Sequence, residues 1–365
     1  MTIYRGNLTI TVKITFQGAI IMKRTFIIIA LAALTVVISS IGCKKEGAQQ
    51  GQEGAAKYQI AVIPKGTTHI FWKSIHAGAV KAEKELKAAG VDVEIIWKGP
   101  LKEDDRESQI KVVEGFITRG VTGIVLAPLD DAALRIPVKD AVNSGIPVVI
   151  IDSGLDSKDY TSFVATDNKV GGRKGGECLA EILGGKGKVI MLRYQEGSAS
   201  TMNREEGFLD VLKEKYPDIE VVSSNQYGGA TTESAYMASE NLLAPLRKAD
   251  GTLTIDGIFC PNESTAFAML RALQDSGLAG KVKYVGFDSS DRLVKGLAEG
   301  EIHGLVLQDP INMGYLGVKT LVEHLQGKEV EKRIDTGSAV ATPENMNEPK
   351  IKNLLEPDFK KWLNE

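Results

Sequence analysis

The chain has 365 residues, of which 43% are hydrophobic and 25% are charged, as in globular proteins, and it is long enough for two domains. The formal net charge is −3 and no stripe of lysine and arginine occurs, so a nucleic-acid-binding surface is not expected. The four histidines lack the spacing of a metal site, and we expect no metal.

Residues 22–43, MKRTFIIIALAALTVVISSIGC, have the layout of an export signal. A basic pair, Lys23 and Arg24, precedes 13 apolar residues at 26–38. A membrane-spanning helix needs about 20 such residues, which favours export over a retained anchor. The signal begins at Met22, which favours a start there and marks residues 1–21 as a mis-started extension.

Gly42-Cys43 ends the apolar run and resembles a bacterial lipobox, in which the cysteine is lipidated and becomes the mature N-terminus. Ser40 stands where leucine is usual in that motif. Residues 44–57 follow without any aromatic or branched aliphatic side chain, so they cannot build a core. We expect this segment to be a flexible tether.

From residue 58 onward, short apolar runs alternate with helical patterns. One such pattern begins at Trp72 and continues with apolar residues three or four positions apart, which predicts a one-faced helix. Continuous apolar strands between helices indicate parallel sheets covered on both faces. The predicted strands are 59–63, 93–97, 123–127, 146–151, 188–192, 220–223, 256–260, 282–287 and 305–307.

These strand–helix units are too many for one sheet of ordinary size. The sequence therefore predicts an α/β fold with two similar doubly wound lobes. Residues 160–168 are the first candidate for a break between them. Two stretches also echo each other, VTGIVLAPLDDAAL at 121–134 and IDGIFCPNESTAFAML at 255–270. We interpret them as equivalent units of the two lobes.

Polar side chains follow several of the predicted strands at the first or second position. In open parallel sheets, ligands bind beyond the carboxyl ends of the strands. Carboxylates and amides hydrogen-bond hydroxyl groups, and aromatic rings pack on the C–H faces of sugars. Phe71 and Trp72, in the opening turn of the first helix, face the same edge. The polar residues in these positions are Asp152, Asn262, Asp288 and Gln308.

These residues predict a site for a small polyhydroxylated ligand. The sequence has no GxSxG, HExxH, CxxC or phosphate-loop motif, so we expect neither an enzyme nor a cofactor. GGKGK at 184–188 precedes a strand and is interpreted as a turn. The charged stretch KEDDRES at 102–108 is interpreted as a solvated helix entrance.

Residues 58–330 resemble the bacterial periplasmic sugar-binding proteins of the ribose-binding type, the solute receptors of ABC importers. The resemblance rests on stretches that occur in family order. It implies two Rossmann-like lobes joined by a three-strand hinge, with the first lobe at 58–166 plus 309–337 and the second at 167–308 plus 338–365. The stretches are IFWKSIHAGAVKAEKEL, GVTGIVLAPLDDAAL, GIPVVIIDSGL, ATDNKVGG, LGGKGKVIML, NREEGF, IFCPNES, VGFDSS and GEIHGLVLQDPINMGYLGV.

The resemblance also implies which residues contact the ligand. A lysine at the position of Lys65 touches the ligand in the autoinducer- and rhamnose-binding branch, which "IPKG" and "WKGP" resemble. Ser153 stands where ribose receptors carry arginine, and Ala230 or Tyr227 where they carry an aromatic residue, so the specific ligand stays open. The implied contacts are Lys65, His69, Phe71, Trp72, Asp152, Arg204, Asn262, Asp288 and Gln308.

Several of these residues also have a structural interpretation. Phe71 and Trp72 could belong to the core, and Asn262 and Asp288 could cap helices. Arg204 could pair with Glu205 or Glu206 on the surface. Gln308 could satisfy the hinge backbone.

The resemblance implies an extracytoplasmic sugar receptor that delivers its ligand to an ABC permease. We expect a monomer tethered to the membrane through a lipid on Cys43. A receptor that presents its ligand to a chemoreceptor or sensor kinase fits the same residues. A transcription regulator shares the core but would need a helix-turn-helix where this chain has a signal peptide.

Overall fold

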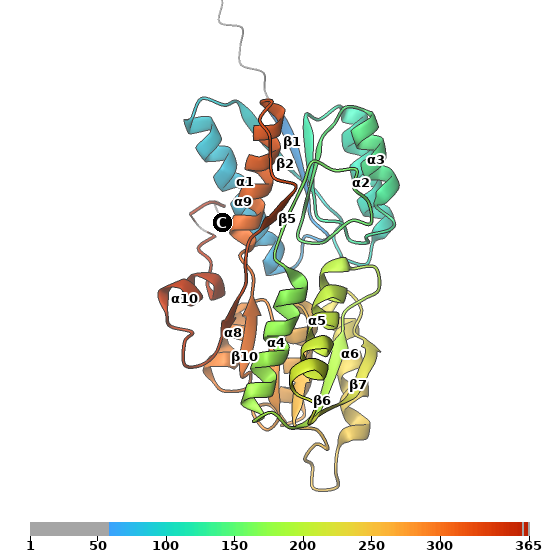
Figure 1. Cartoon of the computed structure of the whole chain (residues 1–365), viewed down its shortest axis with the longest axis vertical. Helices are drawn as coiled ribbons and strands as arrows, with labels where there is room; N and C mark the ends of the chain where they lie inside the picture. Colours follow the sequence, from blue (N-terminus) through green and yellow to red (C-terminus); the bar gives the residue numbers. More distant parts are fainter. Residues whose placement is uncertain (1–57, 360, 364–365) are drawn as a thin grey trace, which may run out of the picture. The chain divides into compact units, whose positions relative to one another are not determined.

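Two six-stranded sheets, each flanked by helices, form the two lobes of the protein (Figure 1). The computed structural model describes residues 58–359 and 361–363. The predicted signal at 22–43, its lipidation site Cys43 and the tether at 44–57 lie outside the described residues. In the described part, no helix is both long and apolar enough to span a membrane.

The first lobe is built on an entirely parallel sheet with the strand order β11-β5-β4-β3-β1-β2. Its strands are β1 (Tyr58–Ile63), β2 (Val93–Trp97), β3 (Gly123–Leu126), β4 (Val148–Ile151), β5 (Ser162–Ala165) and β11 (Arg333–Asp335). Its helices are α1 (Ile70–Ala88), α2 (Arg106–Arg119), α3 (Arg135–Asn143) and α9 (Pro310–Leu325).

The second lobe repeats this arrangement with the order β12-β10-β9-β8-β6-β7, in which only β12 is antiparallel to its neighbour. Its strands are β6 (Gly187–Arg193), β7 (Ile219–Tyr227), β8 (Gly257–Phe259), β9 (Lys283–Phe287), β10 (Gly304–Leu307) and β12 (Ala339–Ala341). Its helices are α4 (Asn168–Ile182), α5 (Ala199–Lys215), α6 (Thr232–Leu243), the 3-10 turn Ala244–Leu246, α7 (Glu263–Asp275), α8 (Asp291–Ala298) and α10 (Pro349–Leu355).

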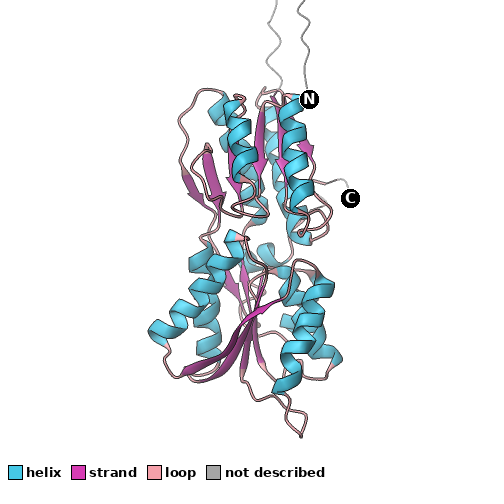
Figure 2. Ribbon diagram, turned by 90° about the vertical axis from the view of Figure 1, so that its right-hand side faces the viewer, coloured by secondary structure: helices cyan, strands magenta, loops and turns pink. Residues whose placement is uncertain are grey.

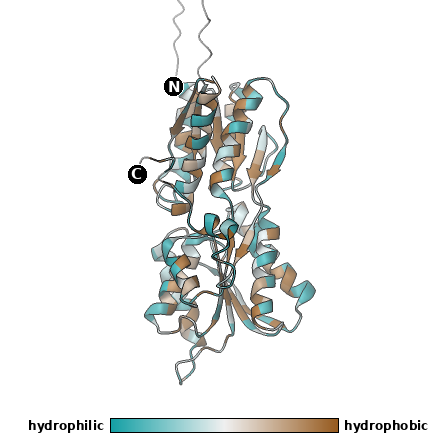
Figure 3. Cartoon of the chain, turned by 90° about the vertical axis from the view of Figure 1, so that its left-hand side faces the viewer, coloured by the Kyte–Doolittle hydropathy of each residue, from teal (hydrophilic) through white to brown (hydrophobic). Residues whose placement is uncertain are grey.

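Both faces of each sheet are covered, as the continuous apolar strands predict (Figure 2). In β6, Val189 and Met191 join the core beneath α4 and α5, whereas Ile190 and Leu192 join the core on the other face. Hydrophobic residues accordingly concentrate on the strands and hydrophilic ones on the helices and loops (Figure 3). The predicted fold of two doubly wound lobes is confirmed.

The two echoing stretches contain β3 and β8, which occupy equivalent positions in the two sheets, so that interpretation is also confirmed. Three strands were missed. β5 lies inside the segment 160–168 that was interpreted as a break, and the chain leaves the first sheet only after it. β11 and β12 have three residues each, too few to show a periodic pattern, and their partners lie far away in sequence.

The chain passes between the sheets three times, after β5, after β10 and after β11. The first and third passes are hydrogen-bonded side by side. The Thr166 hydroxyl donates to the Gly337 carbonyl at 3.0 Å, and the Asp167 amide donates to Asp335 Oδ1 at 3.0 Å. After α10 the chain returns toward the first lobe, where Lys84 Nζ on α1 donates to the Trp362 carbonyl at 3.0 Å.

In each lobe, two helices cross at a pair of glycines. A Cβ added to Gly78 on α1 would lie 1.9 Å from the Ile311 carbonyl oxygen at the start of α9. In the second lobe, a Cβ on Gly172 would lie 1.9 Å from the carbonyl oxygen of Arg204, which fixes α5 against α4. Only glycine allows backbones to approach this closely. The crossing in the second lobe therefore positions a predicted site residue.

We expect Gly78→Ala to destabilise the protein by about 3 kcal/mol, because the added methyl meets a backbone atom that cannot move aside. Gly115→Ala is the matched control. It lies on the exposed side of α2 with nothing within 4 Å of the added carbon. Since alanine is the better helix former, this change should stabilise the protein by up to about 1 kcal/mol. Urea unfolding measures both, and equal free energies of unfolding would show that the α1–α9 crossing relaxes freely.

Candidate ligand-binding site

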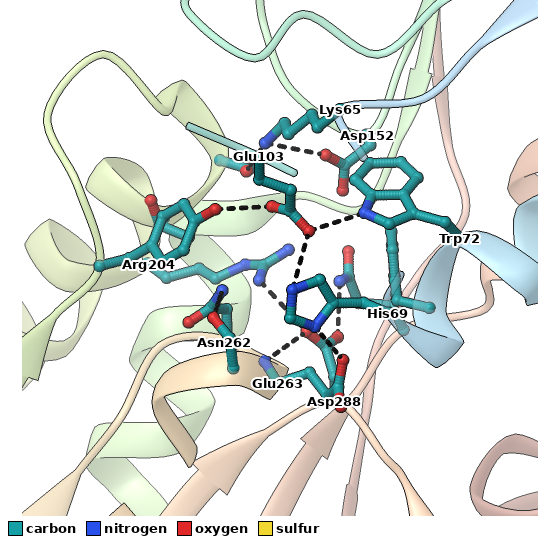
Figure 4. Close-up of a pocket in the computed structure, with 15 residues that line it drawn as sticks. Lys65, His69, Trp72, Glu103, Asp152, Arg204, Asn262, Glu263 and Asp288 are labelled. Atoms are coloured by element: carbon teal, nitrogen blue, oxygen red, sulfur yellow. Dashed lines mark hydrogen bonds and ion pairs between the residues drawn. The ribbon is translucent and has the colours of Figure 1, made fainter. Parts of the chain in front are cut away.

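A cavity of about 350 Å³ lies between the two lobes, beyond the carboxyl ends of the strands (Figure 4). All nine residues predicted to contact a ligand line it: Lys65, His69, Phe71, Trp72, Asp152, Arg204, Asn262, Asp288 and Gln308. Six further residues complete the lining: Glu103, Tyr194, Ser200, Thr201, Glu263 and Ser264.

Two aspartates of the cavity have left-handed backbone conformations. Asp152 directly follows β4 with φ of 60°, and Asp288 directly follows β9 with φ of 67°. These strands are equivalent in the two sheets, and no other non-glycine residue of the described chain has positive φ. Such conformations are energetically unfavourable, although aspartate tolerates them better than most residues, and they cluster at functional sites. Both lobes therefore present a carboxylate to the cavity in the same strained way.

Asp288 is buried and held by donors on both of its oxygens. Gln308 Nε2 donates to Oδ1 at 2.7 Å, and the Glu263 amide at the start of α7 donates to Oδ2 at 3.2 Å. Burial raises the pKa of Asp288 to about 6, although the charge of Arg204 and the bond from Gln308 favour the ionised form. Asp288 does not cap α8, where Ser290 is the N-cap residue, so that alternative is wrong.

Arg204, from α5, lies at the base of the cavity with 2% of its surface exposed. Its Nε donates to Asn168 Oδ1 at 2.8 Å, and its Nη1 donates to the Pro261 carbonyl at 3.0 Å. The guanidinium lies 4.0 Å from the Phe287 ring centroid and 3.8 Å from Asp288 Oδ2. Burial lowers the pKa of Arg204, which nearby carboxylates oppose, and the group remains a cation at neutral pH.

The alternative that Arg204 pairs on the surface is wrong. Glu205 is bonded by Arg193 Nε at 2.7 Å, and Glu206 lies 3.0 Å from Lys169 Nζ. Arg204 instead points inward from the same helix.

Lys65, two residues after β1, connects the lobes at one end of the cavity. Its Nζ lies 3.1 Å from Asp152 Oδ2 within the first lobe. Across the cavity, it donates to the hydroxyls of Ser198 at 3.2 Å and Ser200 at 3.0 Å. Only 3% of Lys65 is exposed, so its charge is satisfied by these neighbours.

The aromatic pair of α1 belongs to both the core and the site. Phe71 and Trp72 meet edge to face with 5.0 Å between ring centroids, and both also join the first-lobe core. Trp72 Nε1 donates to Glu103 Oε1 at 2.7 Å, and the Tyr194 hydroxyl donates to Glu103 Oε2 at 2.6 Å from the second lobe. Burial raises the pKa of Tyr194 well above its usual value, with a further contribution from Glu103, so the phenol stays a donor.

The interpretation of residues 102–108 as a solvated helix entrance is correct for most of the segment, where Asp105 caps α2, but it is wrong for Glu103. The exposed fraction of Glu103 is 8%, because its hydrogen bonds with Trp72 and Tyr194 hold it between the lobes. His69 lies beside it, with Nε2 3.7 Å from Glu103 Oε1 and Nδ1 3.0 Å from Glu263 Oε2. Burial alone would lower the pKa of His69, but the bond to Glu263 and the charges of both glutamates raise it to about 9.

Asn262 and Gln308 supply amides to the cavity. Asn262 caps α7, since its Oδ1 accepts from the Thr265 amide at 3.3 Å, and its Nδ2 donates to Ser264 at 3.0 Å. Gln308 does not serve the hinge backbone, because its Nε2 bonds Asp288. Its Oε1 is buried without a hydrogen-bond partner in the described chain. Such an oxygen is unfavourable unless a further donor arrives, so it points to a ligand hydroxyl.

Sequence reasoning missed six lining residues. Tyr194 directly follows β6, so it has the same signal, a position just past a strand, that predicted Asp152 and Asp288. Ser200 lies one helical turn before Arg204 on the same face of α5. Glu263 and Ser264 directly follow Asn262, which was predicted, so their sequence position was a signal for them too. No sequence pattern distinguishes Glu103, because it lies among other charged residues in the loop before α2.

Tyr227, considered as the aromatic residue of the second lobe, does not line the cavity. It is 38% exposed and packs against Arg193, with 4.8 Å between the guanidinium and the ring centroid. Ala230 lies in a neighbouring chamber. The aromatic surface of the cavity therefore comes from Phe71 and Trp72 in the first lobe and Tyr194 in the second.

The cavity chemistry suits a neutral, hydroxyl-rich ligand. The cations Lys65, His69 and Arg204 each lie within 4 Å of a carboxylate, so no unpaired cation is left to bind an anionic ligand. Carboxylates held in this way still accept hydroxyl protons on their free lone pairs. Among the described residues, no cluster of histidine, cysteine and acidic side chains could hold a metal.

The chain belongs to the family defined by the periplasmic binding protein domain, whose profile matches residues 60–329. This family implies a location outside the cytoplasm. The expected relationship to the ribose-type sugar-binding proteins is confirmed.

Relatives named for sugar binding cover most of the chain. The D-allose-binding periplasmic protein of Escherichia coli (strain K12) is 30% identical over 277 residues, which are 74% of this chain and 84% of the relative. A carbohydrate transporter solute-binding protein from Agrobacterium radiobacter, solved with D-arabinose, is 36% identical with a TM-score of 0.75 and covers 82% of this chain and 99% of its own. An ABC transporter solute-binding protein from Agrobacterium vitis, solved with D-fucose, is also 36% identical, with a TM-score of 0.75 and coverage of 81% and 99%.

Proposed function

We propose that the protein is an extracytoplasmic receptor that binds a monosaccharide between its lobes and delivers it to an ABC importer. The observation that carries this proposal is the convergence of nine sequence-predicted side chains from both lobes on one cavity. The buried and unsatisfied Gln308 Oε1 within it supports a hydroxyl-bearing ligand.

Asp152 and Asp288 anchor the ligand from the two lobes. A sugar whose oxygens accept hydrogen bonds from Arg204, and whose hydroxyls donate hydrogen bonds to Asp152, Asp288 and Gln308, bridges both lobes. Bridging stabilises the closed arrangement over the open one, so binding shifts the population of the two states. A permease that contacts both lobes then distinguishes the loaded receptor from the empty one.

The ligand class follows from the side chains that line the cavity and from the names of the relatives. Its carboxylates, amides and aromatic rings suit one pentose or hexose ring. D-arabinose, D-fucose and D-allose, named for three relatives, belong to this class. Ser153 stands where the ribose receptors carry an arginine, and its hydroxyl accepts from the Ser200 amide at 3.0 Å across the lobes. That position holds the lobes together, and the preferred sugar should therefore differ from ribose.

The membrane anchor and the oligomeric state belong to the same proposal. The lipid on Cys43 is supported by the sequence of residues 22–43. A monomer is sufficient, because the cavity is lined from the two lobes of one chain.

A thermal-unfolding panel tests the proposed function. Ligands that bind only the folded state raise the midpoint by mass action, with about 2.7 kcal/mol of stabilisation at 100 times Kd. We expect at least one of D-arabinose, D-fucose, D-allose and D-ribose to raise the midpoint of the purified protein. Sodium acetate and glycine, which are charged and lack a sugar ring, serve as controls. Unchanged midpoints with every pentose, hexose, deoxysugar and polyol would show that the ligand class is wrong.

A further inference from the structure

A second, larger chamber lies beside the ligand cavity and shares His69, Glu103 and Glu263 with it. It is lined by Thr67, Lys73, Lys102, Thr232 and Phe267 besides the three shared residues. The segment 67–73 bounds it from the first lobe, and residues 230–233 bound it from the second. Thr67, Thr68 and Glu233 are exposed, so this chamber is continuous with solvent, whereas most of the cavity lining is buried. The three shared residues therefore separate an inner compartment from an outer one.

The imidazole of His69 forms the middle of this partition (Figure 4). Its Nδ1 lies 3.0 Å from Glu263 Oε2 of the second lobe, and its Nε2 lies 3.7 Å from Glu103 Oε1 of the first. Only 14% of the His69 side chain is exposed, and the two glutamate side chains are 9% and 12% exposed. The three side chains form one continuous wall across the gap between the lobes.

Both glutamates of the wall are positioned by other parts of the structure. His69 directly precedes α1, with φ −84° and ψ 147°. Glu103 is held by Trp72 and Tyr194, and Glu263 is the first residue of α7. The proton on His69 favours both contacts, because the carboxylates of Glu103, Glu263 and Asp288 surround it. A ligand that needed the space of the ring would break two charged contacts at once.

We propose that the His69 ring determines ligand size, by confining the ligand to one sugar ring and excluding any substituent that would extend into the outer chamber. This inference rests on the proposed function and adds a selectivity that the family resemblance does not give. If it is correct, removing the ring joins the two compartments. The protein should then accept a sugar that carries a bulky group at the position facing His69.

The experiment compares the tightest-binding sugar of the panel with its mono-O-benzyl derivatives, one for each hydroxyl, by isothermal titration calorimetry. For the wild-type protein, every benzyl derivative should bind at least about 100-fold more weakly than the free sugar, because an enclosed and well-packed site does not accept added volume. For His69→Ala, at least one derivative should recover at least about tenfold relative to the free sugar. The ratio of the two affinities is the readout, so a general loss of affinity does not affect it.

Two variants separate the volume of the ring from its charge. Glu263→Gln keeps the volume of the wall but removes one carboxylate charge, so it should weaken the free sugar and leave the ratio unchanged. Thr232→Trp fills the outer chamber without touching the cavity. Added to His69→Ala, it should abolish the recovered binding of the benzyl derivative and leave the free sugar unaffected.

Each outcome is informative about one of the two proposals. If no sugar binds the wild-type protein, the proposed function fails, and the size filter fails with it. If a sugar binds but its benzyl derivatives bind equally well, or if a folded His69→Ala keeps the wild-type ratio, the size filter is wrong while the receptor function stands. Should circular dichroism show that His69→Ala is unfolded, His69→Asn, a smaller side chain that can still bond Glu263, gives the same comparison.

Discussion

Asp288→Asn is expected to abolish sugar binding and to stabilise the sugar-free protein at pH 7. The amide cannot accept two hydroxyl protons as the carboxylate does. The backbone tolerates the change, because asparagine adopts the left-handed conformation of Asp288 as readily as aspartate does. The side chain of Gln308 can turn over, so that its oxygen accepts from the new amide. The variant therefore keeps the fold while it loses the ligand.

The stability gain follows from the pKa of Asp288, which is about 6 in the folded protein against 3.8 for the free side chain. Between these pH values the folded state binds more protons than the unfolded state, so stability falls as pH rises from about 4 to about 6. Above pH 6 the loss is complete and amounts to about 3 kcal/mol. Asp288→Asn removes this loss, so its advantage should be largest at pH 7 and vanish below about pH 4.

Urea unfolding of both proteins at pH 4, 5, 6 and 7, with a thermal shift at pH 7, measures the two effects. Asp291→Asn is the matched control, since the same substitution at an exposed position in the first turn of α8 should leave sugar binding intact and change stability by less than about 1 kcal/mol. Wild-type affinity in Asp288→Asn would remove the residue from the site. A variant that is less stable than wild type at pH 7 would show that the carboxylate mainly supports the fold.

The residues that the sequence predicted correctly share a topological cause. In a parallel sheet, all strands end at the same edge, so a polar residue just past a strand lies there whatever the distance along the chain. Asp152, Asp288 and Gln308 were therefore predictable from apolar runs alone. The equivalent stretches at β3 and β8 indicated two such edges. Their placement against one another, around one cavity, came from the family resemblance.

The residues that were not predicted depend on contacts between the lobes. Nothing in KEDDRES distinguishes Glu103 from its charged neighbours, and its burial results from a tryptophan before it and a tyrosine of the other lobe. The strands β11 and β12 were not predicted for a similar reason. Three residues carry no usable periodicity, and each becomes a strand only because β5 or β10 offers an edge. Local pattern cannot report an interaction whose partner lies about 30 to 170 residues away.

Arg204→Met should abolish sugar binding and destabilise the protein by about 3–5 kcal/mol, the usual consequence of removing one member of a buried charged pair. Methionine fills much of the volume, so the loss is electrostatic. The Asn168 side chain and the Pro261 carbonyl lose their donor, and Asp288 loses its nearest cation. Urea unfolding and the thermal-shift panel provide both readouts. Arg173→Met is the control, because its pair with Glu214 lies at the surface, where solvent screens it, so its loss should change stability far less.

Combining Arg204→Met with Asp288→Asn tests how much of the stability loss comes from the Arg204–Asp288 ion pair and how much from the other contacts of Arg204. If the main penalty of Arg204→Met is a carboxylate left buried without a cation, Asp288→Asn should stabilise the Arg204→Met variant by more than it stabilises the wild-type protein, although the sugar still does not bind. The double variant should then be more stable than Arg204→Met alone, with the difference growing as pH rises above the pKa of Asp288. Strict additivity of the two substitutions would mean that the two charges do not interact. The cavity would then be organised around the hydrogen bonds of Arg204 to Asn168 and Pro261 instead of around the ion pair.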